Sequence, residues 1–196
     1  DFEGTARPQG AAPDIGADER IAGPLAIGAT SPLPQGEIGV SYSKSLLVTG
    51  GKGPYKIALT SGSLPGGLSL VGQNISGRPT ASGNKTLTVK VTDQIGTSVS
   101  KTFTLTILKA VAVSTLSLPL GRAGRSYTAT LKAANGKTPY SWSITGGILP
   151  AGLVFNGSTG AISGTPKVVG SPTLTFQVTD GLGGKASKNP KLTVMR

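Results

Sequence analysis

The chain contains an internal repeat, and this feature limits the possible folds more than any other. Residues 64–79 (LPGGLSLVGQNISGRP) reappear in altered form as residues 149–166 (LPAGLVFNGSTGAISGTP). Upstream of these stretches, matched residues such as Tyr42 and Tyr127 are 85 positions apart. Repetition over this length indicates two copies of one structural unit arranged in tandem.

The spacing between the copies changes at one place only. Asp93 and Asp180, which lie downstream of the repeated stretches, are 87 positions apart instead of 85. The two additional residues of the second copy fall around Asn156–Gly160, between two short apolar runs. Surface turns tolerate such changes in length when the flanking strands keep their places, so we expect a turn at this position.

The composition and the alternation of apolar residues predict strands throughout. The chain has 30 Gly and 14 Pro, and only 14% of its 196 residues are charged. Apolar and polar residues alternate over residues 86–92 and 102–107, the pattern of antiparallel strands with one buried face. No segment shows a sustained helical period. Seven short strands in each copy, joined by Gly/Pro corners, predict an all-β chain of two tandem immunoglobulin-like antiparallel β-sandwiches.

We place the first of these domains at residues 21–109 and the second at residues 110–196. Strands are expected near residues 24–29, 40–49, 55–60, 68–71, 74–76, 86–92 and 98–108 of the first copy. Almost no linker separates the copies at Leu108–Ala112. Because so short a connection leaves few residues free to bend, we expect an extended, semi-rigid pair.

The motifs of both copies resemble the bacterial "putative Ig" family, which is related in fold to cadherin-like modules. The second copy carries Leu-Pro-x-Gly-Leu at 149–153, Gly-x-Ile-x-Gly-Thr-Pro at 160–166 and Val-Thr-Asp-x-x-Gly at 178–183. The first copy departs from the middle motif at 74–79, where the leading Gly and the Thr are missing. The resemblance implies repeated extracellular modules, and hence an extracellular or cell-surface location, without implying an activity.

Residues 1–20 differ from the remainder in charge and in resemblance. They contain five acidic and two basic residues, whereas the rest of the chain has three acidic and 17 basic residues. The patterns Asp-x-x-Gly-Thr-x-Arg-Pro at 1–8 and Asp-Ile-Gly-Ala-x-Glu at 14–19 resemble the closing segment of right-handed parallel β-helix proteins of the pectate-lyase-like type. This resemblance implies that residues 1–20 are the remnant tail of a β-helix domain that precedes residue 1 in the parent protein.

The residue types that most enzymes need are missing. The sequence contains no His and no Cys, which excludes His-based triads, thiolate chemistry and disulfides. It also lacks a phosphate-binding loop and a pair of carboxylates with catalytic spacing inside one repeat. We therefore expect no enzymatic activity. No apolar run approaches the length of a membrane span, so no membrane insertion is expected.

Asp93 and Asp180 each end a strand just before a predicted hairpin, which makes them weak candidates for calcium ligands. Calcium needs six to eight oxygens, and each repeat supplies few carboxylates. The alternative is a turn in which the carboxylate accepts backbone N–H groups. We favour the turn and expect no cofactor. The junction between modules, where Glu37 or Glu19 approaches a neighbour, is the remaining place for calcium.

Trp142, Tyr140 and Tyr55 are the candidates for a sugar-binding platform. Alternation places Trp142 and Tyr140 on one face of a strand, and Ile57 occupies the position of Trp142 in the first copy. Since an isoleucine cannot stack on a sugar ring, this match favours a core role for Trp142.

The sequence favours a structural function over a binding function. Its formal net charge of +11 would attract polyanions, but the basic residues are dispersed and no aromatic residues alternate with them. We expect a monomeric spacer whose partners are other domains of a large bacterial surface or secreted protein, with no specific nucleic-acid partner. The alternative is a binding module for an anionic surface polysaccharide.

Overall fold

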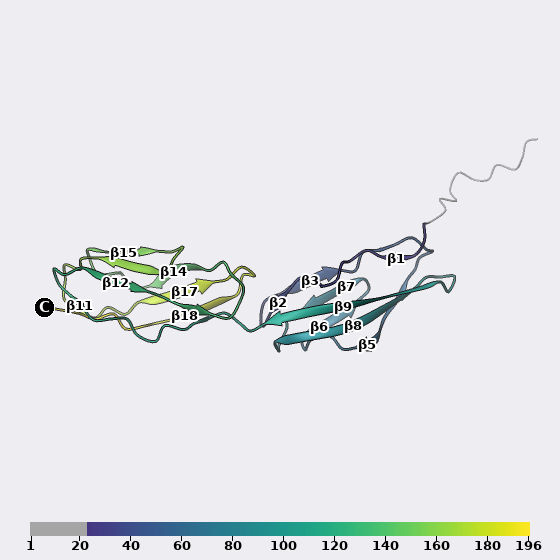
Figure 1. The fold of residues 1–196 in the computed structure, drawn as a ribbon, viewed down its shortest axis with the longest axis horizontal. Coiled ribbons are helices and arrows are strands. Elements are labelled where there is room, and N and C mark those ends of the chain that lie inside the picture. The colour runs from purple at the N-terminus through teal and green to yellow at the C-terminus, as the bar shows by residue number, and fades with distance from the viewer. Residues whose placement is uncertain (1–22) are drawn as a thin grey trace, which may run out of the picture.

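The computed structural model describes residues 23–196, and within them it contains nineteen β-strands and no helix. None of the described residues therefore forms a helix that could cross a membrane. The predicted all-β fold of two tandem domains is confirmed, and the two domains lie end to end (Figure 1). The predicted β-helix tail at residues 1–20 lies outside the described residues.

The first domain consists of two packed layers with a short additional strand pair. One layer is the four-stranded sheet β2-β9-β8-β5, the other is the three-stranded sheet β3-β7-β6, and β1 pairs with β4. The strands are β1 (Ala26–Ile27), β2 (Gly36–Glu37), β3 (Tyr42–Ser45), β4 (Val48–Thr49), β5 (Lys56–Gly62), β6 (Leu68–Val71), β7 (Asn74–Gly77), β8 (Gly83–Thr92) and β9 (Ser98–Leu108).

The long hairpin of β8 and β9 supplies much of the first core. These strands pair antiparallel along their whole length, and alternate side chains of both are fully buried. The buried side chains of the hairpin are Leu87, Val89, Val91, Phe103, Leu105 and Ile107. Burying a large apolar side chain stabilises a fold by about 1.5–3 kcal/mol, so this alternation fixes which face of the sheet is turned inward.

The second domain repeats this architecture with shorter strands. Its layers are the sheets β14-β17-β18 and β12-β16-β15, accompanied by the pairs β10-β13 and β11-β19. The strands are β10 (Ala112–Val113), β11 (Gly121–Arg122), β12 (Tyr127–Thr130), β13 (Ala133–Ala134), β14 (Ser141–Gly146), β15 (Leu153–Asn156), β16 (Ala161–Gly164), β17 (Thr175–Thr179), β18 (Lys185–Lys188) and β19 (Val194–Met195). The four residues between β15 and β16 form the turn that carries the two additional residues of this copy.

The repeated tyrosines tie the chain at corresponding corners. The Tyr42 hydroxyl donates to the Pro34 carbonyl over 3.1 Å, and the Tyr127 hydroxyl donates to the Pro119 carbonyl over 3.2 Å. Both rings are buried in their cores. The spacing of 85 residues that links these two Tyr–Pro pairs in the sequence therefore reflects one local structure formed twice.

The structure differs from the predicted strands at three places. The expected strand at 40–49 is divided into β3 and β4, because Leu47 has a positive φ of 54° that interrupts an extended backbone. The expected strand at 24–29 is only two residues long, and β2 was not predicted. Two residues offer too short an alternating pattern to be recognised.

The two cores place their fully buried phenylalanine on different strands. Phe103 of β9 is matched in the second copy by Pro190, which separates β18 from β19 because proline has no N–H to donate. Val89 of β8 is in turn matched by the fully buried Phe176 of β17. The fully buried phenyl group therefore lies on β9 in the first domain and on β17, the counterpart of β8, in the second.

Candidate functional site at the domain junction

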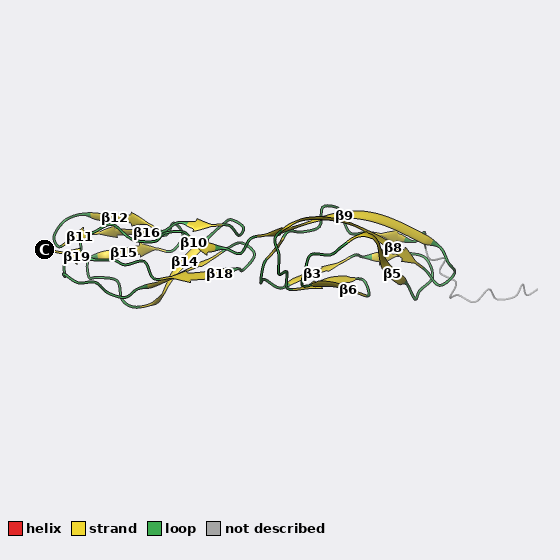
Figure 2. Cartoon of the chain, turned by 90° about the horizontal axis from the view of Figure 1, so that it is seen from below, coloured by secondary structure: helices red, strands yellow, loops and turns green. Residues whose placement is uncertain are grey.

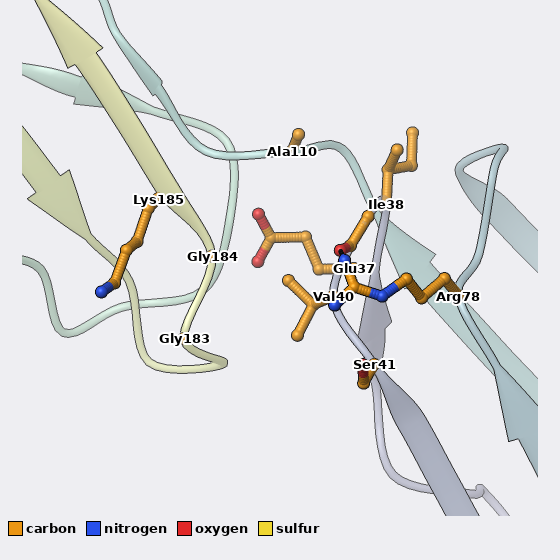
Figure 3. Close-up of a pocket in the computed structure, with 10 residues that line it drawn as sticks. Glu37, Ile38, Val40, Ser41, Arg78, Ala110, Gly183, Gly184 and Lys185 are labelled. Carbon is orange, nitrogen blue, oxygen red and sulfur yellow. Dashed lines mark hydrogen bonds between the residues drawn. The ribbon is translucent and has the colours of Figure 1, made fainter.

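The junction brings together the ends of both sandwiches, joined by residues 109–111 (Figure 2). Its walls are the turn after β2 in the first domain and the turn before β18 in the second. A cleft of about 460 Å³ lies between these turns, and the residues lining it are shown in Figure 3.

The Asp93 carboxylate organises the hairpin turn of the first domain. It accepts hydrogen bonds from the backbone N–H groups of Lys52 (3.1 Å), Ile95 (3.1 Å) and Thr97 (2.8 Å). These are the bonds that the turn interpretation predicts, because an aspartate after a strand can satisfy the donors of a tight turn.

Asp180 holds the corresponding turn of the second domain in the same way. Its oxygens accept from the N–H groups of Lys137 (2.6 Å), Leu182 (2.9 Å) and Gly184 (2.8 Å). Within residues 23–196, no three Asp, Glu, His or Cys side chains gather where they could hold a metal ion. Each aspartate thus accepts backbone N–H groups of a turn at the same end of its domain.

Glu37 reaches from the first domain into the second. It lies in β2, which runs parallel to β9, and its Oε1 accepts a 2.7 Å hydrogen bond from the N–H of Val111. The preceding Gly36 permits this position, since a β-carbon there would lie 2.8 Å from Ile107. Only 1% of the Glu37 surface is exposed, so the junction covers a carboxyl group that would otherwise be hydrated.

Gly184 provides the space that Glu37 occupies. A β-carbon at Gly184 would lie 2.8 Å from Cδ of Glu37, closer than such atoms approach in real proteins, and nearer still to Oε1. Figure 3 shows the Glu37 carboxyl group directed toward Gly184 and the turn that contains it. The matched residue in the first domain is Thr97, and the residue matched to Glu37 in the second domain is Arg122. The Glu37–Gly184 fit is therefore particular to this junction.

The two carboxyl groups at the junction differ in their affinity for protons. The pKa of Glu37 is raised from 4.5 to about 7, first by burial and then by its hydrogen bond with the Asp180 carboxyl group. Burial also acts to raise the pKa of Asp180, but hydrogen bonds from Glu37 and from three backbone N–H groups outweigh it and lower that pKa. A proton at the junction therefore resides on Glu37 rather than on Asp180.

Nearby basic side chains do not neutralise Glu37. The Arg78 guanidinium donates to the Gly39 carbonyl over 3.0 Å, and the Lys185 side chain extends away from the Glu37 carboxyl group (Figure 3). Among the described residues, Oε2 of Glu37 is a buried side-chain oxygen that no donor reaches when the group is ionised.

The aromatic candidates lie elsewhere. Trp142 is 8% exposed and packs in the second core, so its ring offers no face to a sugar. Tyr140 and Tyr55 each pack against a core and donate to a backbone carbonyl, of Asn135 and Gly50 respectively, over 2.6 Å. The three candidate residues for a sugar platform thus belong to two different domains.

Tyr55 also lines a shallow groove of the first domain. The groove has a volume of about 590 Å³, and its walls include the amide side chains of Gln73 and Asn74. Gln73 is partly engaged, because its Oε1 accepts from the N–H of Val48.

Sequence reasoning considered Glu37 at the junction only as a calcium ligand and missed its pairing with Asp180. The available signal was the rarity of acidic residues after residue 20, where Glu37, Asp93 and Asp180 are the only three. Glu37 also stands in an apolar and glycine-rich stretch, Gly-Glu-Ile-Gly-Val, in which a charged side chain needs a specific partner.

Comparisons with known proteins agree with this architecture. The sequence model of the family described as "Putative Ig domain" matches residues 24–108 and 110–195. The serine-rich adhesin for platelets of Staphylococcus aureus (strain MRSA252) is 32% identical over 168 residues, which cover 82% of this chain and 12% of that protein. The same adhesin from strain MSSA476 is also 32% identical over 168 residues, covering 7% of its length.

Solved structures show the same fold. The titin I-band fragment I67-I69 aligns with a TM-score of 0.51 and 17% identity, covering 87% of this chain and 65% of that one. This likeness concerns the fold alone.

Proposed function

Because the chain belongs to the Putative Ig domain family, we propose that its two domains are non-catalytic structural modules that act as a spacer in a large bacterial surface protein. The observation that carries this proposal is the junction, where residues 109–111 connect the domains and Glu37 binds the N–H of Val111. Both features limit bending, because few residues are free and one side chain bridges the two bodies.

The similarity to adhesins supports a location at the cell surface. The matched adhesin regions represent only a small part of their proteins, about a tenth or less of the length. A repeated module that forms a small part of an adhesin suits the role of holding other domains away from the cell. The resemblance of residues 1–20 to the end of a β-helix would make such a helix one of the domains that are presented.

The proposed spacer function is tested by measuring the distribution of distances between the two domains. The chain has no cysteine, so cysteines introduced at the exposed positions Lys90 and Ser158 can carry spin labels, one on each domain. We expect a narrow distribution of label-to-label distances at mildly acidic pH, as a semi-rigid rod requires. A broad distribution, such as two domains on a free hinge would give, contradicts the proposal.

The groove at Tyr55 favours one second candidate, a binding module for an anionic polysaccharide. An aromatic ring beside amide side chains is suited to sugars, and the net charge of +11 would assist an acidic one. The test is a glycan array with hits titrated at low and physiological salt. Saturable binding that survives salt, is lost in Tyr55→Ala and is kept in the matched control Tyr140→Ala would support this function; attraction that salt abolishes would exclude it.

A further inference from the structure

We propose that Glu37 and Asp180 share a proton across the domain junction, and that losing this proton loosens the contact between the two domains. The inference builds on the proposed rod, because it concerns what holds the rod straight. It rests on two buried carboxyl groups from different domains that both lie against Gly184: its N–H donates to Asp180 over 2.8 Å, and a β-carbon there would lie 2.8 Å from Cδ of Glu37. Glu37 also binds the N–H of Val111.

The hydrogen bonds around the pair decide which group carries the proton. Asp180 accepts from three backbone N–H groups, which favour its ionised form. Oε2 of Glu37 has no donor in reach and gains nothing from ionisation. A protonated Glu37 can instead donate its O–H to Asp180 while Oε1 still accepts from Val111, so every polar atom of the side chain is then satisfied.

The basic side chains on the segments around Glu37 and Asp180 do not compensate the negative charge that appears when the proton is lost. Arg78 follows β7, Lys109 lies in the connection between the domains, Lys137 precedes β14 and Lys185 begins β18. In the part of the chain that the structure describes, none of these side chains hydrogen-bonds either carboxyl group; Lys137 contacts Asp180 only through its backbone N–H. Ionisation of Glu37 therefore places two negative charges together in a site from which water is largely excluded.

The pH window follows from the pKa of Glu37 in the two states. In the docked state it is about 7, and when the domains separate it returns toward 4.5. Below pH 4.5 both states hold the proton and the contact is at full strength. As the pH rises from 4.5 to 7, the separated state releases the proton first, so the contact weakens, and above 7 the loss is complete. The docking equilibrium should fall by roughly 300-fold across this range.

The first experiment measures the proton itself. The sequence has three glutamates, Glu3, Glu19 and Glu37, so their side-chain carboxyl carbons can be followed individually by ¹³C NMR as the pH of the full chain is changed. Glu37→Gln assigns the signal. We expect one glutamate to titrate near pH 7 and to vanish from the spectrum of Glu37→Gln. If all three glutamates titrate near their ordinary pKa, the proposal is overturned, whether or not the molecule is a rod.

The second experiment measures the consequence for the junction. Spin labels at positions 90 and 158 report the distance between the domains, with EDTA present, from pH 5 to 9. Wild type should show a narrow distribution at pH 5 that broadens toward pH 8. Glu37→Gln should stay narrow throughout, because its amide can donate to Asp180 and accept from Val111 at any pH. If the wild-type distance distribution does not change with pH, the proposed loosening of the contact is refuted, even if the pKa of Glu37 is raised.

Calcium provides the contrasting outcome. A proton-dependent contact should not respond to calcium added at pH 8, because the carboxylate oxygens present are too few for a calcium site. If the added calcium narrows the wild-type distribution at pH 8, the carboxyl pair shares a metal ion instead of a proton, and the proposal is refuted.

Discussion

Adding one methyl group at Gly184 tests whether the fit between the domains is as close as the structure shows. Gly184 does not have a left-handed backbone, so alanine introduces no conformational strain. The three heavy atoms nearest to the new β-carbon all belong to Glu37. The substitution should therefore leave the second domain unstrained and act on the junction, by forcing the Glu37 side chain to move.

The expected loss can be worked out from the contacts. Displacing Glu37 breaks its bond with the N–H of Val111 and leaves that buried donor without a partner, which costs about 1–3 kcal/mol. Replacing a glycine stabilises the second domain by about 0.4–1 kcal/mol, because the unfolded chain loses freedom. In the wild-type background we therefore expect Gly184→Ala to destabilise the second domain by on the order of 1 kcal/mol.

The control is the same substitution in a Glu37→Ala background. Removing the side chain of Glu37 removes the three heavy atoms nearest to the new β-carbon, so Gly184→Ala should be neutral or slightly stabilising there. The assay is chemical denaturation followed by the fluorescence of Trp142, which is the single tryptophan of the chain and reports the second domain. An equal effect of Gly184→Ala in both backgrounds would show that the methyl group acts within the second domain, and the reasoning about the junction would fail.

Three further predictions concern the domains themselves. Trp142→Ala should destabilise the second domain by about 3–5 kcal/mol, since it empties a large core volume. Circular dichroism during chemical denaturation should then show the transition of the second domain at a lower denaturant concentration, while that of the first domain does not change. Asp93→Ala leaves three backbone N–H groups of the first turn without their acceptor, so the first domain should lose about 2–3 kcal/mol with Trp142 fluorescence unchanged. Burial raises the pKa of Tyr42 to about 12, so the folded state disfavours ionisation and the first domain should lose stability as the pH rises from 10 to 12. Tyr42→Phe should remove this loss of stability. If the first domain of the variant still loses stability over this pH range, the assignment to Tyr42 is wrong.

The fold could be predicted from the sequence because the repeat and the alternation are independent signals that agree. The alternating apolar residues of 86–92 and 102–107 are the buried face of the hairpin β8–β9. The matched tyrosines and the turn-forming aspartates occupy equivalent places in both domains. Such features are local, so a single sequence is enough to recognise them.

The junction could not be predicted in the same way because it depends on contacts between distant residues. Glu37 and Asp180 are far apart in the sequence, and nothing in their own surroundings shows that they meet. The absence of a side chain at Gly184 matters only once Glu37 is known to lie against it. The different positions of the buried Phe103 and Phe176 were hidden for a similar reason, because they concern two paired strands and not one local pattern.

The parallel pairing of β2 with β9 determines how the first domain responds to mechanical force. The chain runs from the described N-terminal end to β2 at the junction, and β9 leaves the domain at the same end (Figure 1). A pull along the rod draws β2 and β9 in opposite directions along their length. The hydrogen bonds between them, including that from the Ile38 N–H to the Leu108 carbonyl, are then loaded together in shear and are not opened one by one. β11 and β19 are paired in parallel at the far end of the second domain, so the same arrangement resists tension twice along one chain.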